Sequence, residues 1–148
     1  MPEISRQPAD LILSGGTIVT QDAARRVIAD GAMQRWFTPE FRADAAGGGA
    51  QRVSELRARL EQLDPKAYAA SCLAVSGIDF RSSNRTITCP ALVIAGTRDE
   101  ATPVAMSQAI QGSIPGALLR KIDAAHLSAV EQPLQFAALV EDFLKGQA

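Results

Sequence analysis

The first third of the chain changes from a strand-like to a helix-like pattern. Residues 10–31 place short runs of β-branched and apolar side chains on both sides of polar turn signals, which predicts a β-hairpin or a small meander. From residue 32 onward three aromatic side chains fall within six positions, and the chain then turns at Pro39. We therefore expect a boundary near residue 32.

Two helices are predicted in the next segment. Residues 51–63 repeat apolar side chains every three or four positions, with Arg and Glu between them, as an amphipathic helix does. Asp64 followed by Pro65 is typical of a helix start, and Gly77 is typical of an end, so a second, Ala-rich helix is expected between them.

In the second half of the chain, predicted strands alternate with predicted helices, as in an α/β protein. Residues 91–96 form a continuous apolar run bounded by Pro and Gly, as expected of a parallel strand covered on both faces. Thr102 and Pro103 predict a capped helix, a second strand follows at 117–123, and a last helix spans roughly 132–145. Strand, helix and parallel strand make a βαβ unit of a larger parallel sheet.

Composition and charge narrow the classes of function. Hydrophobic residues make up 47% and charged residues 21% of the 148 residues, and the net charge is -1. These values are typical of a globular domain, and they argue against a nucleic-acid or membrane partner. Cys72 and Cys89 are expected to be small buried hydrophobes, and a single His excludes a His-rich metal centre. We expect a cytoplasmic protein without metal or cofactor.

Asp99 and His126 are the residues best placed for chemistry. Asp99 follows the first parallel strand and His126 lies just past the second, and ligands bind at that edge of a parallel sheet. A carboxylate there can fix the tautomer of an imidazole and stabilise its protonated form. The alternative is a solvated turn carboxylate beside a surface or capping His.

The sequence segments around Asp99 and His126 resemble the C-terminal part of α/β-hydrolases. The stretches CPALVIAGTRDEATP and IPGALLRKIDAAHLSAVEQPLQFAALVEDFL carry the likeness, which implies that Asp99 is the triad acid and His126 the triad base. Upstream, MQRWFTPEFR and LRARLEQLDPKAYAASC resemble the helical cap of the 3-oxoadipate enol-lactonases of aromatic-compound degradation.

The resemblance implies a division of the chain and a substrate site. Residues 1–31 are expected to be an N-terminal β-hairpin segment, 32–80 the helical cap, and 81–148 the C-terminal part of an α/β-hydrolase core. A cap over the pocket makes Arg35, Trp36 and Tyr68 candidates for binding a small-molecule lactone or ester that carries a carboxylate. The aromatic side chains, Trp36 among them, fit a role in the cap core at least as well.

The chain departs from that family at the nucleophile. None of its ten serines lies in a Gly-x-Ser-x-Gly motif, and Ser14, beside two glycines, lacks the strand-to-helix turn of a nucleophile elbow. The predicted fold is therefore a partial α/β-hydrolase fold, a C-terminal βαβα unit plus helical cap with an N-terminal β-hairpin. We expect a truncated hydrolase with little or no activity alone.

Other interpretations remain open. Residues 9–32 resemble the opening strands of amidohydrolases, which would make the gene a chimera, although one His cannot build the metal centre of that family. A non-catalytic domain that assembles through an exposed sheet edge, as a homo-oligomer or strand-swapped dimer, is the main alternative function. A gene product without a selected function is a third.

Overall fold

The computed structural model describes residues 11–13, 17–19 and 23–146, and the first described elements form a short antiparallel strand pair. Strand β1 (Leu11–Leu13) pairs with β2 (Thr17–Val19), which confirms the predicted hairpin. The turn between the two strands, with Ser14, lies outside the described residues.

The prediction of a third strand, which would make a meander, is wrong, because helix α1 (Ala23–Trp36) occupies those positions. Ala29, Ala32 and Met33 are buried, and their three- and four-residue spacing places them on one helix face. Burial of that face outweighs the local β-branched signal of the sequence, since tertiary packing overrides weak propensities. The helix passes through residue 32 without a break, and the division into 1–31, 32–80 and 81–148 stays a prediction.

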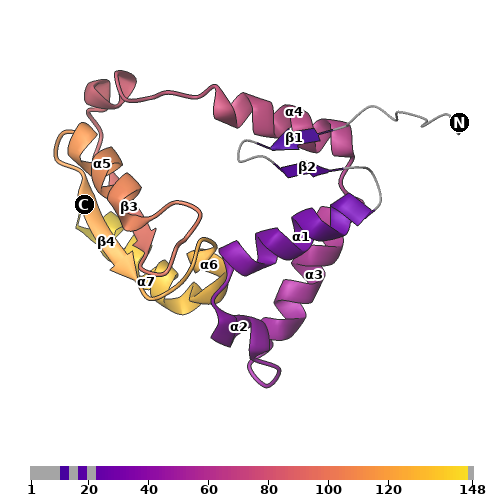
Figure 1. Cartoon of the computed structure of the whole chain (residues 1–148). Coiled ribbons are helices and arrows are strands. Elements are labelled where there is room, and N and C mark those ends of the chain that lie inside the picture. The colour runs from indigo at the N-terminus through magenta and orange to yellow at the C-terminus, as the bar shows by residue number, and fades with distance from the viewer. Residues whose placement is uncertain (1–10, 14–16, 20–22, 147–148) are drawn as a thin grey trace, which may run out of the picture.

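Three further helices follow α1. They are α2 (Pro39–Ala43), α3 (Gly49–Gln62) and α4 (Pro65–Ser76). Figure 1 shows α1, α2 and α3 grouped together, while α4 leads back toward the second half of the chain. The predicted helix start is confirmed, because the Asp64 side chain accepts hydrogen bonds from the first backbone N–H groups of α4.

A small hydrophobic core holds α1, α2 and α3 together. Phe37 is 1% exposed and stacks on Phe41, with the ring centroids 5.4 Å apart. Partly buried side chains from several elements pack against the buried cluster of Ala32, Met33 and Phe37: Trp36, Phe41, Val53, Leu56, Leu60, Leu127 and Val130. Leu127 and Val130 come from the other end of the chain, so this core joins the two halves.

The predicted βαβ unit is present. After a short 3-10 helix (Ser83–Thr86), β3 (Leu92–Gly96) leads through α5 (Val104–Ser113) to β4 (Leu118–Ile122). The two strands are parallel, with Leu92 opposite Leu118 and Gly96 opposite Ile122. Helix α5 packs on both strands.

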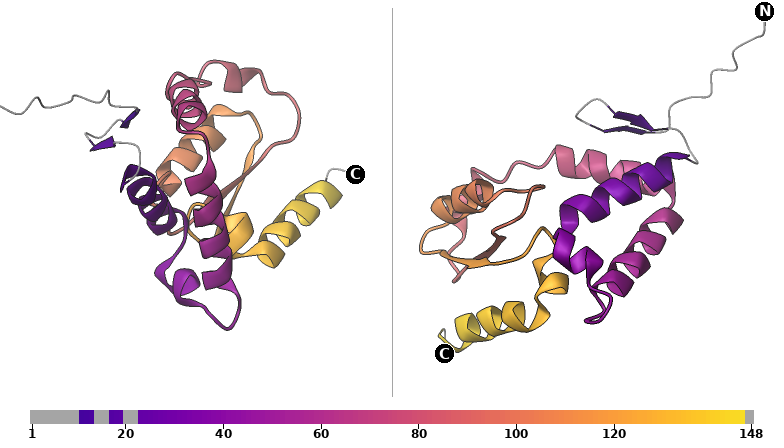
Figure 2. Two further views of the ribbon diagram at one scale, coloured as in Figure 1. Left: turned by 90° about the vertical axis from the view of Figure 1, so that its right-hand side faces the viewer. Right: turned by 60° about the horizontal axis from the view of Figure 1, so that its bottom comes forward.

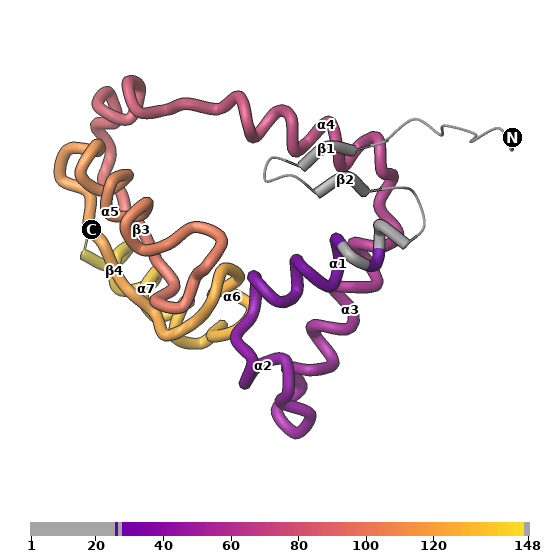
Figure 3. Tube along the Cα trace, viewed as in Figure 1, coloured from indigo at the N-terminus to yellow at the C-terminus, as the bar shows by residue number. Residues whose placement is uncertain are grey.

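The chain closes with α6 (Ser128–Glu131) and α7 (Pro133–Lys145). Figure 2 shows α5 and α7 on either side of the strand pair, and α7 packs against β4. Figure 3 traces the path from β4 to the corner between α1 and α2, where α6 begins. There the Leu127 N–H donates to the Trp36 carbonyl at 3.0 Å.

Only one of the two cysteines, which were both expected to be buried, is partly removed from solvent. Cys72 is half-buried, as a small hydrophobe in a helix can be, whereas Cys89 is exposed. The expectation of burial is therefore wrong for Cys89, because it lies in the irregular segment before β3 rather than within the strand.

Candidate active site

Asp99 lies just beyond the end of β3. Pairing with the second strand continues into this loop, since Thr97 N–H donates to the Ile122 carbonyl at 2.9 Å and Arg98 N–H to the Ala124 carbonyl at 3.0 Å. These bonds hold the start of the Asp99 loop against the segment that leads to His126.

The Asp99 carboxylate is saturated with hydrogen-bond donors. One oxygen, Oδ1, accepts from the backbone N–H groups of Ala101 and Thr102, each at 2.8 Å. The other, Oδ2, accepts from the Thr102 hydroxyl at 2.7 Å. Burial alone would raise the pKa of Asp99, but the bonds from Thr102 and His126 outweigh it and hold the pKa below its ordinary value of 3.8. The carboxylate is therefore ionised at neutral pH.

His126 faces this carboxylate. Its Nδ1 lies 2.9 Å from Asp99 Oδ2 and 3.2 Å from the Thr102 hydroxyl oxygen. Because the carboxylate only accepts, this geometry favours the tautomer with the proton on Nδ1. The side chain of His126 is 32% exposed, against 7% for Asp99. The imidazole can then present an unprotonated Nε2 to a substrate or nucleophile, which is what a general base requires.

Thr102 has a different role from the one its sequence context predicts. The position before α5 is occupied by Pro103, and no side chain caps that helix. The Thr102 hydroxyl instead bonds to Asp99 and borders the imidazole. The prediction of a Thr102 helix cap is wrong because α5 starts one residue later than the sequence suggests, with Pro103 at the N-cap, and the Thr102 hydroxyl donates to the Asp99 carboxylate.

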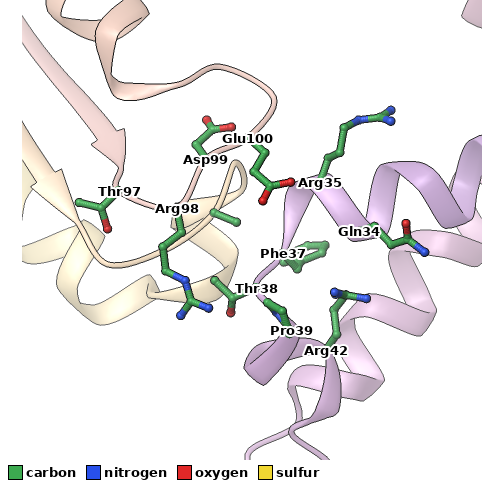
Figure 4. Close-up of a pocket in the computed structure, with 11 residues that line it drawn as sticks. Gln34, Arg35, Phe37, Thr38, Pro39, Arg42, Thr97, Arg98, Asp99 and Glu100 are labelled. Atoms are coloured by element: carbon green, nitrogen blue, oxygen red, sulfur yellow. The ribbon is translucent and has the colours of Figure 1, made fainter.

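A pocket with a volume of about 720 Å³ opens beside this pair. Figure 4 shows its two walls, with Thr97 to Glu100 on one side and residues of α1 and α2 on the other. Arg35, one of the residues expected to bind substrate, lines this pocket. So does Arg42, whose Nε is buried without a hydrogen-bond partner among the described residues. His126 itself is not among the lining residues, although its neighbour Ala125 is.

Trp36 and Tyr68 are not among the residues that line this pocket. Trp36 is half-buried against the core cluster, the alternative that the sequence left open for the aromatic residues. Tyr68 is half-buried on α4, and burial raises its pKa, with a further contribution from Cys72. The positive charge of the Arg35 guanidinium acts in the opposite direction and lowers the pKa of Tyr68.

Glu131 is a site neighbour that the sequence analysis missed. It is 8% exposed, and its carboxylate binds the Thr38 hydroxyl as well as the Ala125 N–H, the latter at 3.0 Å. Nothing in its sequence neighbourhood indicates burial, because Glu is mostly exposed in proteins and the Thr38 partner of Glu131 lies 93 positions away. Arg42 and Thr102 were likewise missed.

No metal site or membrane span is visible in the described part of the chain. Its His, Cys, Asp and Glu side chains form no group of three that could hold a metal ion. None of its helices combines the length and apolarity that a membrane crossing requires.

Comparison with known proteins finds similar chains among hydrolases. A scan of family models finds no match. The chain is 38% identical over 118 residues to 3-oxoadipate enol-lactonase 2 of Acinetobacter baylyi, a match that covers 80% of this chain and 43% of that protein. The chain thus spans less than half the length of this relative.

Solved structures agree with the sequence match. The enol-lactonase of Burkholderia xenovorans superposes with a TM-score of 0.76 at 31% identity, covering 82% of this chain and 45% of that structure. A hydrolase of Pseudomonas aeruginosa superposes with a TM-score of 0.72 at 36% identity, covering 80% of this chain and 43% of that structure. The fold is part of an α/β-hydrolase fold. The amidohydrolase resemblance of residues 9–32, and with it the chimeric gene, finds no support in these relatives.

Proposed function

We propose that the chain supplies the acid and base of a serine-type hydrolase acting on a lactone or ester. The observation that carries this proposal is the Asp99–His126 contact of 2.9 Å at the carboxyl end of two parallel strands. In such a reaction His126 takes the proton of an attacking serine and returns it to the leaving group. Asp99 holds the imidazole in the required tautomer and stabilises its charged form.

The nucleophile comes from residues other than these 148. An attacking serine needs a strained elbow and an oxyanion hole, and none of the ten serines lies in a Gly-x-Ser-x-Gly motif. The chain alone is therefore proposed to hydrolyse little or nothing. Treatment with a fluorophosphonate should leave its intact mass unchanged. A single adduct that disappears in His126→Ala would show that one of the ten serines completes the triad.

The proposed substrate carries a carboxylate, as in the 3-oxoadipate enol-lactone type of reaction. Arg35 and Arg42 both line the pocket, and the buried Nε–H of Arg42 has no hydrogen-bond acceptor among the residues that the structure describes. A third cation of the pocket, Arg98, is engaged with Glu40 at 2.5 Å. Guanidinium groups bind carboxylates in a fixed fork geometry, so the two remaining arginines suit an anionic substrate.

A graft supplies the missing nucleophile and tests the proposal. The 118 matched residues would replace their counterparts in the Acinetobacter baylyi enol-lactonase, and hydrolysis of 3-oxoadipate enol-lactone would be measured. We expect an active graft that loses about a millionfold in kcat with His126→Ala and about ten-thousandfold with Asp99→Asn. Glu141→Gln, on the exposed face of α7, is the matched control and should change neither kcat nor KM. A folded graft without activity would contradict the proposal.

A second candidate function is assembly through exposed apolar surface, with a second copy as the partner. Leu118 on β4 is 40% exposed and Leu134 on α7 is 86% exposed. Within the described residues each strand of the parallel pair has a single neighbour. A homo-oligomer or strand-swapped dimer would cover both features.

A further inference from the structure

Glu131 lies between the two halves of the site, and its environment is unusual for a carboxylate. It is buried on α6, and no salt bridge ties it to a cation in the described structure. Arg98, the nearby guanidinium, is engaged with Glu40 instead. A buried charge without a paired cation is costly unless hydrogen-bond donors satisfy it.

The donors that satisfy Glu131 come from two segments, one six positions away and the other 93 positions away. Oε2 accepts the backbone N–H of Ala125 at 3.0 Å, directly before His126. Oε1 accepts the Thr38 hydroxyl, and the Thr38 N–H lies 3.4 Å from both oxygens. Thr38 stands at the corner between α1 and α2, on the wall of the pocket opposite Asp99. One carboxylate thus connects the histidine loop to the cap.

The backbone on both sides of His126 is fixed. Ala125 N–H is bound by Glu131, and Leu127 N–H is bound by the Trp36 carbonyl at 3.0 Å. The imidazole is then aligned by Asp99 as a third point. A shift of about 1 Å at a reacting group can reduce a rate about a hundredfold, so this alignment matters for the chemistry.

We propose that Glu131 is a positioning residue that sets the orientation of His126 against Asp99 by bridging the Ala125 amide to Thr38 of the cap. This inference rests on the proposed function, because it assigns Glu131 a role for the base of that reaction. It also predicts that the cap and the base are mechanically coupled, so that a displaced cap alters the imidazole.

The single histidine of the chain gives a direct readout. At a pH well above the ordinary imidazole pKa of about 6.5, nitrogen NMR shifts of the ring report the tautomer of His126 without any assignment. In the intact chain we expect the Nδ1–H tautomer to dominate. Glu131→Ala should at least halve its population while the chain remains folded, since the Ala125 amide loses its acceptor.

Two further substitutions make the outcome decisive. Glu131→Gln retains one oxygen for the Ala125 amide, so it should restore most of the Nδ1–H population and keeps the test valid if Glu131→Ala fails to fold. Glu141→Gln, an exposed carboxylate of α7, is the matched control and should leave the ring shifts unchanged. Wild-type ring shifts in folded Glu131→Ala, or loss of the Nδ1–H tautomer in folded Glu131→Gln, would overturn the inference.

Asp99→Asn separates this inference from the function on which it rests. An Asn amide facing Nδ1 should switch the imidazole to the Nε2–H tautomer. If Asp99→Asn leaves the tautomer unchanged, the acid–base pair itself fails and the proposed function falls. If Asp99→Asn switches the tautomer but Glu131→Ala does not, only the role of Glu131 is refuted.

Discussion

Asp99 is kept ionised mainly by neutral hydrogen-bond donors. Two backbone N–H groups and the Thr102 hydroxyl bind its oxygens, and together with His126 they lower the pKa of a carboxyl that burial would raise. A group whose pKa is lower in the folded than in the unfolded chain stabilises the fold above its unfolded pKa. That stabilisation is lost as the pH falls through the folded pKa.

Asp99→Asn should therefore change the pH dependence of stability. At neutral pH we expect the free energy of unfolding to fall by about 1–2 kcal/mol, because an amide cannot accept all the donors. The difference from wild type should shrink as the pH falls below the ordinary Asp pKa of 3.8, because the lowered pKa of Asp99 is then approached and the wild-type carboxylate becomes protonated. Urea unfolding followed by the fluorescence of Trp36, the single Trp, measures both values. Asp142→Asn, on the exposed surface of α7, is the control and should lower stability little at any pH. If the stability difference between Asp99→Asn and wild type stays constant with pH, the lowered pKa of Asp99 is contradicted.

At the scale of elements, the end of β3 requires a glycine. A Cβ built on Gly96 would lie 2.4 Å from the Ala125 carbonyl oxygen and 2.6 Å from that of Ala124. Both contacts are with backbone, which cannot move aside without displacing the chain before His126. The close approach of these two segments is thus what brings Asp99 and His126 within hydrogen-bond distance.

Gly96→Ala should destabilise the fold by about 2 kcal/mol, since the added methyl has no room. Gly112→Ala is the matched control, because it lies in α5 with no atom within 4 Å of an added Cβ. It should stabilise the helix by about 0.5 kcal/mol or more. The stabilities of Gly96→Ala, Gly112→Ala and wild type are compared by thermal unfolding followed by circular dichroism. Equal stability of the two variants would show that the β3 end tolerates displacement.

Local signals determined which elements could be predicted. The apolar run of β3 and the Asp64 start of α4 depend on neighbouring residues, and both were predicted correctly. The helix over Ala23–Trp36 was not, because its buried face is explained only by contacts with α3 and with Leu127. Among the site residues, Asp99 and His126 follow strand ends, whereas one of the two partners of Glu131, Thr38, lies 93 positions away.

At the scale of the whole molecule, much apolar surface is uncovered. Leu73, Phe80, Leu134 and Leu144 are each more than half exposed. These side chains lie on α4, the segment after it and α7, so the exposure is spread over several elements. Large exposed apolar areas favour association with another surface.

Sedimentation velocity should accordingly show association that increases with protein concentration. His126→Ala should associate to the same extent, because the imidazole does not contribute to the apolar surface. Leu134→Gln should shift the association to higher concentration, by roughly tenfold if one buried Leu contributes about 1.5 kcal/mol. A monomer over the whole concentration range would contradict assembly between copies and leave the acid–base proposal unaffected.

The bond between Thr38 and Glu131 also has a consequence for the order of folding. It closes a loop of 93 residues, whereas the Asp99–His126 contact closes only 27. The longer closure costs about 1 kcal/mol more in chain entropy, from the logarithm of the two lengths. The acid–base pair can therefore assemble within the β3–α5–β4 unit first, and docking of the α1–α2 corner follows. In a growing polypeptide, the Thr38 hydroxyl therefore has no Glu131 acceptor until another 93 residues have been synthesised.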